Sequence, residues 1–167
     1  MKYYLLAISI ALSIFCSAVL AAESPEGESK GWLLDAENDA ARFELLQKYL
    51  RGFDQPMWEV GKRFRAVHDA LSRDNYELAA YHWDKIRITI KNGYLKRPAR
   101  RADAEAILLN TTWAEVNEAF GTRDAGKAWA AFDKARNACM ACHVAESVPY
   151  MNNQHLFDLS RPSSKTK

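Results

Sequence analysis

The most informative stretch of the 167-residue chain is residues 124–145, with the sequence DAGKAWAAFDKARNACMACHVA. Small and apolar residues recur in it at steps of three and four, the spacing that places side chains on one face of an α-helix. Pro149 follows shortly afterwards, so we expect the helix to end before it. The predicted buried face leads directly into two cysteines and consists of Ala125, Ala128, Phe132, Ala135, Cys139 and Cys142.

Three further segments show the same helical periodicity, at about 56–72, 76–93 and 102–120. A shorter segment at 35–50 is also compatible with a helix. No segment alternates with a period of two, as a half-buried strand would. The sequence therefore predicts an all-α fold, namely an antiparallel four-helix bundle with an extra N-terminal helix.

Turn residues set the expected ends of these helices. Asn75 is expected to cap the second long helix, Gly93 to end it, and Gly121 to break the chain after the third. The expected core stripes of the first three long helices are Met57, Val60, Gly61, Phe64, Val67 and Leu71, then Tyr76, Ala79, Trp83, Ile86 and Ile90, then Ala106, Leu109, Trp113, Val116 and Phe120.

The start of the chain has the composition of a secretory signal peptide. A basic Lys2 precedes a short apolar run, and small residues close it at Ala21 and Ala22. The run is shorter than the roughly 20 apolar residues that span a bilayer, so we expect cleavage and no stable membrane insertion afterwards. The expected organisation is a signal peptide at 1–22, a flexible segment at 23–34, the helical domain at 35–150 and a polar, loose tail at 151–167.

Charge is unevenly distributed along the chain, although the whole sequence carries only +2. Residues 23–59 hold 9 acidic and 4 basic residues, whereas residues 60–101 hold 11 basic and 4 acidic residues. This local asymmetry argues against a general nucleic-acid binder, and an exported protein would rarely meet nucleic acid. It favours a docking surface or a contact with an anion.

Cys139, Cys142 and His143 form the pattern C-x-x-C-H, which attaches haem c. Each thiol can add across one haem vinyl group, and the histidine then offers its imidazole to the iron from the same side. On a helix these groups share one face, and the buried stripe of the helix leads into them. We expect one covalent haem c in an apolar pocket, with His143 as the proximal ligand and periplasmic localisation.

Other uses of this cysteine pair remain open. Cys16 is expected to leave with the signal peptide, so Cys139 and Cys142 are the cysteines of the mature chain and could form a disulfide or stay as free thiols. A thioredoxin-type pair would need a βαβ setting, which this sequence does not predict. A structural zinc site would need further Cys or His ligands at a suitable spacing, and the sequence offers none.

The opposite face of the haem is expected to meet the start of the first long helix. In an antiparallel bundle that start lies beside the end of the fourth helix. Met57 is therefore a candidate distal ligand, and Gly61 one turn later leaves room for the ring. Met57 could instead be core filler, and Met151 is a weaker rival. The other histidines, His68, His82 and His155, are not expected to be ligands.

The connection after the second long helix is expected at the haem end of the bundle. It is strongly basic and contains Arg97, Arg100 and Arg101. These side chains could hold the haem propionates or steer an acidic redox partner. They could equally form a solvated charged loop.

A C-terminal C-x-x-C-H on the last of four amphipathic helices resembles the cytochrome c′ family. The methionine near the start of the first helix is similar to that of the soluble four-helix b-type cytochromes, and the chain also looks like a group of small secreted monohaem cytochromes. The resemblance implies haem c on Cys139 and Cys142 with His143 proximal, and it allows a homodimer. It also implies an open distal site that binds NO or CO, which a Met57 ligand would close. The extra N-terminal helix departs from the usual pattern.

The expected function is electron transfer without a catalysed reaction. The alternative is a five-coordinate protein that binds NO or CO. A small haem peroxidase would need an acid or base over the iron, and the sequence places none there.

Overall fold

The computed structural model describes residues 31–163, and within that range all regular structure is helical, with no strand. The predicted all-α class is therefore confirmed. The expected signal peptide at 1–22, its Cys16 and most of the charged segment at 23–34 lie outside the described residues. Within those residues, no helix combines the length and the apolar character needed to cross a bilayer.

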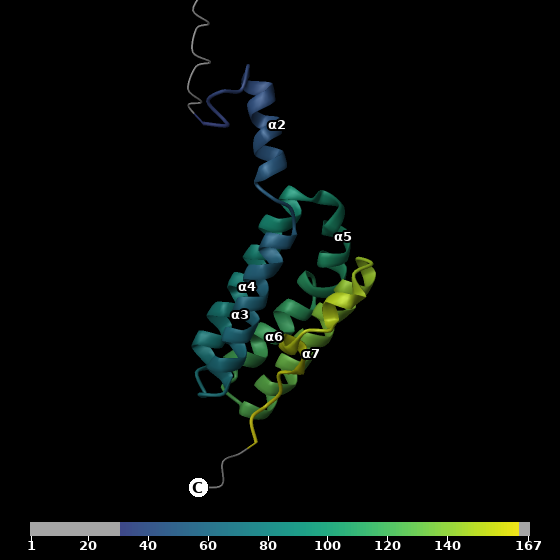
Figure 1. The fold of residues 1–167 in the computed structure, drawn as a ribbon. Helices are drawn as coiled ribbons and strands as arrows, with labels where there is room; N and C mark the ends of the chain where they lie inside the picture. Colours follow the sequence, from purple (N-terminus) through teal and green to yellow (C-terminus); the bar gives the residue numbers. More distant parts are fainter. Residues whose placement is uncertain (1–30, 164–167) are drawn as a thin grey trace, which may run out of the picture. The chain divides into compact units, whose positions relative to one another are not determined.

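The chain divides into two compact units, the first of which ends at Tyr49. In the described part of this unit, α2 spans Asp39–Tyr49 and buries no residue (Figure 1). The side chain of Asn38 caps it by accepting a hydrogen bond from the backbone N–H of Ala41 at 2.9 Å. Trp32 packs edge-on against Tyr49, with ring centroids 5.4 Å apart.

The second unit holds the longer helices (Figure 1). These are α3 (Asp54–Leu71), α4 (Tyr76–Lys96), α6 (Thr112–Gly121) and α7 (Ala125–Ala145). Short elements join or follow them, namely η1 (Pro98–Arg100), α5 (Arg101–Asp103), the π-helix η2 (Ala104–Leu109), and the 3₁₀ turns η3 (Pro149–Asn152) and η4 (His155–Asp158).

Side-chain caps fix where α4 and α7 begin. Asn75 Oδ1 accepts from the backbone N–H of Leu78 at 3.0 Å, which confirms the predicted cap. Asp124 Oδ1 accepts in the same way from the N–H of Lys127 at 2.8 Å. The α7 helix runs from Ala125 to Ala145, almost as predicted.

Gly93 lies inside α4, so the predicted helix end at this residue is wrong. A Cβ added at Gly93 would come within 2.8 Å of Cε2 of Phe53 and within 3.2 Å of Cβ of Pro56. The glycine is needed because the start of α3 packs closely on the last turns of α4.

The same end of the unit also contains the end of α7. Arg100, which follows α4, forms an ion pair with Glu146, which follows α7. At the opposite end, His68 in the last turn of α3 contacts Trp129 near the start of α7, with ring centroids 5.4 Å apart. The start of α3 and the ends of α4 and α7 therefore lie together.

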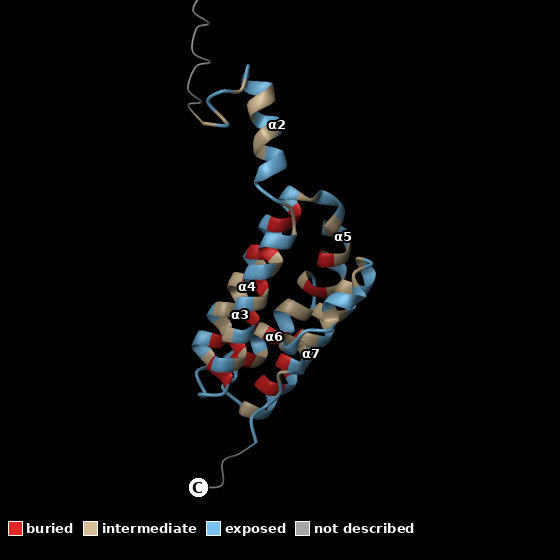
Figure 2. Ribbon diagram, viewed as in Figure 1, coloured by how far each residue is buried: buried red, intermediate tan, exposed pale blue. Residues whose placement is uncertain are grey.

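One apolar core joins the helices of the second unit. Buried positions lie on the sides of α3, α4, α6 and α7 that face one another (Figure 2). In it Phe64 of α3 stacks on Phe132 of α7, with ring centroids 4.6 Å apart. The largest fully buried side chains are Trp83, Phe64, Phe120, Phe132, Leu71, Ile86, Val67 and Val116.

The predicted single helix at 102–120 is wrong, because the π-helix interrupts it. The N–H of Asn110 donates to the carbonyl of Glu105, five residues back, at 3.0 Å. A π-helical turn contains an extra residue, so it shifts the apolar face by one position. Ala104 and Leu108 are therefore buried, while the predicted core residue Ala106 is exposed.

Candidate functional site

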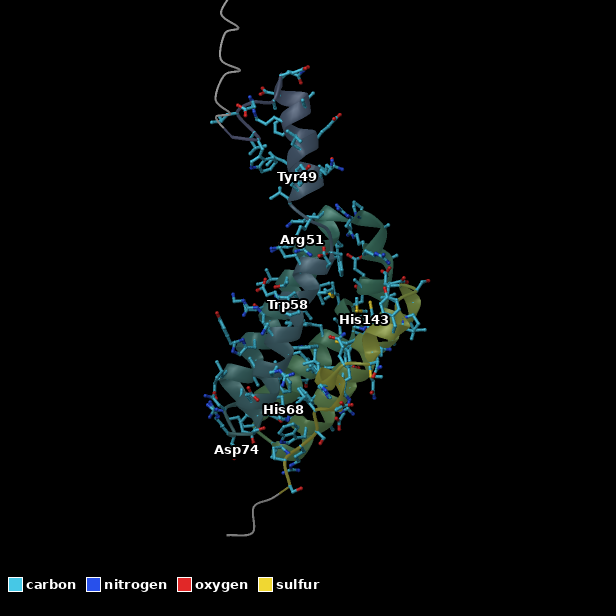
Figure 3. All side chains as sticks on the ribbon, in the orientation of Figure 1. Tyr49, Arg51, Trp58, His68, Asp74 and His143 are labelled. Carbon is cyan, nitrogen blue, oxygen red and sulfur yellow. The ribbon has the colours of Figure 1, made fainter. Side chains whose placement is uncertain are left out.

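Cys139, Cys142 and His143 lie in the last two turns of α7, which Figure 3 labels at His143. Both cysteines are half-buried, and neither forms a disulfide with a residue in the described range 31–163. The three residues fall three and four positions apart on one helix, so they share a face.

The imidazole of His143 is held by a side chain from η3. Its Nδ1 lies 2.8 Å from Oδ1 of Asn152, and Nδ2 of Asn152 donates to the carbonyl oxygen of Met140 at 3.1 Å. The ring of Phe157 meets the imidazole edge-on, with centroids 5.6 Å apart. Nε2 of His143 makes no hydrogen bond with any residue in the range 31–163.

Burial dominates the chemistry of both thiols. It raises the pKa of Cys139 to about 12, and the neighbouring Cys142 adds to the effect. Burial also raises the pKa of Cys142 to about 11, with further contributions from the carboxylates of Glu146 and Asp103, while Arg100 opposes them. Both groups are therefore neutral thiols at neutral pH.

This environment disfavours a thiol–disulfide exchange site. Reactive cysteine pairs have lowered pKa values and commonly lie at helix N-termini, where the helix dipole stabilises a thiolate. Here the pair lies near the C-terminal end of α7, where the dipole has the opposite effect. In residues 31–163, no group of three His, Cys, Asp or Glu side chains is arranged so that it could hold a metal ion.

We expect the thiols of the folded, haem-free chain to react slowly with iodoacetamide at pH 8. A pKa of about 11 leaves roughly one thousandth of Cys142 as thiolate, against about a quarter for an exposed cysteine. The greater nucleophilicity of a more basic thiolate reduces the difference to roughly 20-fold. Mass spectrometry of the alkylated chain gives the rate, and the chain unfolded in urea is the control. Equal rates in both states would contradict the burial of these thiols.

The basic connection reaches this site through Arg100. Besides its ion pair with Glu146, Arg100 donates from Nη1 to the carbonyl of that residue at 3.3 Å. Arg97 lies against Gly52 and donates to the carbonyl of Lys96 at 2.7 Å. Arg100 therefore lies beside the end of α7.

The guanidinium of Arg101 interacts with two residues that are close to it in sequence. Its Nε donates to Glu105 at 2.8 Å, and its guanidinium lies 5.6 Å from the ring centroid of Tyr94. The hydrogen bond with Glu105 raises the pKa of Arg101, so its charge is permanent. No contact in the described residues joins Arg101 to the cysteines.

Met57 lies in the first turn of α3, half-buried and packed against the core. Figure 3 labels Trp58, the next residue, at about the same level along the second unit as His143. Gly61, expected to leave room for a haem ring, lies one turn further along α3. A Cβ added there would lie 3.6 Å from Cδ2 of Leu156, so the space beside Gly61 is lined by the chain after α7.

The remaining histidines and Met151 are also possible iron ligands by residue type, and the structure gives each of them other surroundings. His68 is at the opposite end of the unit, where its Nε2 lies 2.9 Å from the carbonyl oxygen of Ser160. Burial lowers the pKa of His82, with a further effect of Arg63. His155 is fully exposed. Met151 is 43% exposed and belongs to η3, the same turn as Asn152.

Sequence reasoning missed Asn152 because the tail was expected to be loose. The described part of the tail is held along α3 and α7. Leu156 covers Gly61, and Arg136 donates to the carbonyl of Leu159 at 2.7 Å. The polar composition of the tail gives no sign of these contacts, and an asparagine nine residues after a histidine is no known motif.

This donor set is suited to haem c. Cys139 and Cys142 could form the two thioether links, and the free Nε2 of His143 could bind the iron. On the N-terminal side of the motif, half-buried Ala138 and buried Ala135 form a surface of small side chains.

No protein-family model, curated protein or solved structure matches this chain.

Proposed function

We propose that this protein is an exported monohaem c-type cytochrome that carries electrons in the periplasm. One observation carries the proposal. Within residues 31–163, two free thiols lie on the same helix face as His143, whose Nδ1 has a hydrogen-bond partner and whose Nε2 has none. A pre-oriented imidazole beside two neutral thiols suits covalent haem attachment better than redox, zinc or disulfide chemistry.

Each residue would have a separate task. Cys139 and Cys142 would bind the haem covalently, and His143 would bind its iron through Nε2. Haem c, when bound, supplies reversible one-electron transfer. Met57 would offer its thioether on the opposite side, since it lies at the end of the unit that contains the end of α7. Arg100 and Arg97 would offer positive charge to propionates or to an acidic redox partner.

The fold we propose is an antiparallel four-helix bundle made of α3, α4, α6 and α7, similar to the cytochrome c′ family. Pairwise packing supports it, because α3 packs on α4, α4 on α6, α6 on α7 and α7 on α3. The shared core supports it as well. In this proposal α2 is the extra N-terminal helix and is not one of the four bundle helices.

Expression of the full chain in a bacterium that matures c-type cytochromes tests the proposal. We expect a coloured periplasmic protein that keeps its haem on a denaturing gel and begins at Glu23. The double variant Cys139→Ala, Cys142→Ala should lose all covalent haem, because no thioether can form. Haem staining and intact mass give both results.

Cys16→Ala is the matched control for the double variant. It removes a cysteine from the expected signal peptide and should keep the full haem content. A colourless wild-type protein from a host with a working maturation system would refute the proposed function.

A further inference from the structure

Asn152 makes two hydrogen bonds that together determine which nitrogen of His143 carries its proton. A backbone carbonyl can only accept, so the atom of Asn152 that faces the carbonyl of Met140 must be the amide NH₂. The amide oxygen then faces His143, at 2.8 Å from Nδ1. Because this oxygen can only accept, Nδ1 must be protonated and Nε2 carries the free lone pair.

The backbone around Asn152 is fixed by contacts on both sides. On its N-terminal side, η3 is joined to α7 by residues 146–148, and the N–H of Met151 donates to the carbonyl of Val148 at 2.9 Å. On its C-terminal side, Leu156 packs beside Gly61. The carbonyl of Leu159 accepts a hydrogen bond from a side chain of α7, and the carbonyl of Ser160 forms one with a side chain of α3. The amide is therefore held in place before any ligand binds to the imidazole.

We propose that Asn152 is a positioning residue for the His143 ligand, and that it sets the tautomer, the ring plane and the electron donation of the imidazole. This inference rests on the proposed function, because it concerns His143 as an iron ligand. A hydrogen-bond acceptor on Nδ1–H raises the basicity of a histidine ligand, and a carboxylate does so more strongly than a neutral amide. An amide in this place therefore leaves the imidazole a moderate donor, which favours a higher reduction potential than a carboxylate would.

Two substitutions at this position should move the potential in opposite directions. Asn152→Asp places a charged acceptor near Nδ1–H, strengthens donation to the iron and should lower the midpoint potential. Asn152→Leu has a similar size and no acceptor, so it should weaken donation and raise the midpoint potential. In the Met57→Ala background, where the reduced iron would be five-coordinate, the iron–histidine stretching frequency in resonance Raman spectra should rise in the first variant and fall in the second.

Asn153 provides the matched control. It is exposed, and its contact in the structure is a backbone hydrogen bond from its N–H to the carbonyl of Tyr150 at 3.2 Å. Asn153→Asp adds the same charge one residue away, and Asn153→Leu adds the same apolar group. Both should leave the iron–histidine frequency unchanged and shift the potential less than the Asn152 variants do.

The outcomes separate this inference from the proposed function. A haem-bearing wild type whose Asn152 variants match the Asn153 variants in potential and Raman frequency would overturn the role of Asn152 alone. A wild type without haem would overturn both. If Asn152→Leu does not accumulate, Asn152→Asp decides the result, because it keeps the size of the side chain and an acceptor oxygen for Nδ1–H.

Discussion

Replacing Met57 by alanine is expected to convert a reduced protein that ignores carbon monoxide into one that binds it at once. If Met57 holds the iron as proposed, the wild type should give a low-spin spectrum that is indifferent to CO. Alanine cannot reach the iron, and the position opens. Visible spectra of the reduced protein with and without CO give the result.

Met151→Ala is the control for this experiment. Met151 is more exposed than Met57 and lies in η3, whose Asn152 contacts Nδ1 of His143. It should keep the wild-type spectrum. A wild type that already binds CO would show that Met57 is not a ligand and would favour the five-coordinate alternative. A variant that stays low-spin would mean that another residue holds the sixth position.

Local features of the sequence predicted the helices well. The periodicity of α3, α4 and α7 identified their buried faces, because the helical repeat alone decides which side chains share a face. Asn75 was recognisable as a cap, because an asparagine before an apolar helical stripe has few other uses. The motif at Cys139 could be found in the same way, since all three groups lie within five residues.

Features that depend on tertiary contacts could not be predicted. Gly93 looked like a helix end, but the packing of Phe53 and Pro56 against α4 requires a glycine within the helix. The register after Ala104 changes in the π-helix, which no pattern in the sequence announces. A single helical period cannot represent such a shift.

The candidate site divides in the same manner. Cys139, Cys142 and His143, the groups proposed to hold haem, lie close together in sequence, so the motif identifies them. Asn152 contacts His143 only because the chain turns back after Val148. A side chain in a polar tail has no sequence pattern that separates a structural role from simple solvation, so this part of the site required the structure.

The largest expected effect on stability comes from Phe132, which is fully buried in α7. Its ring stacks on Phe64 at 4.6 Å and meets Trp129 edge-on at 5.7 Å. Phe132→Ala removes the ring and leaves a cavity, so we expect the free energy of unfolding to fall by about 3–5 kcal/mol. Urea denaturation followed by far-ultraviolet circular dichroism measures the change. Phe43→Ala removes the same ring from a position that is 66% exposed and should cost less than about 0.5 kcal/mol.

The same variant separates packing from haem ligation. Phe132 lies seven residues before Cys139 on the buried face of α7, two helical turns from the motif. If Phe132 only packs α7 against α3, the haem-bearing Phe132→Ala protein should unfold at lower urea and keep the wild-type spectrum. If the stack also fixes the position of α7 relative to Met57, the variant should gain CO binding as Met57→Ala does. Equal stability of the Phe132 and Phe43 variants would contradict the shared core, because cavities in a close-packed interior are costly whereas exposed rings contribute little.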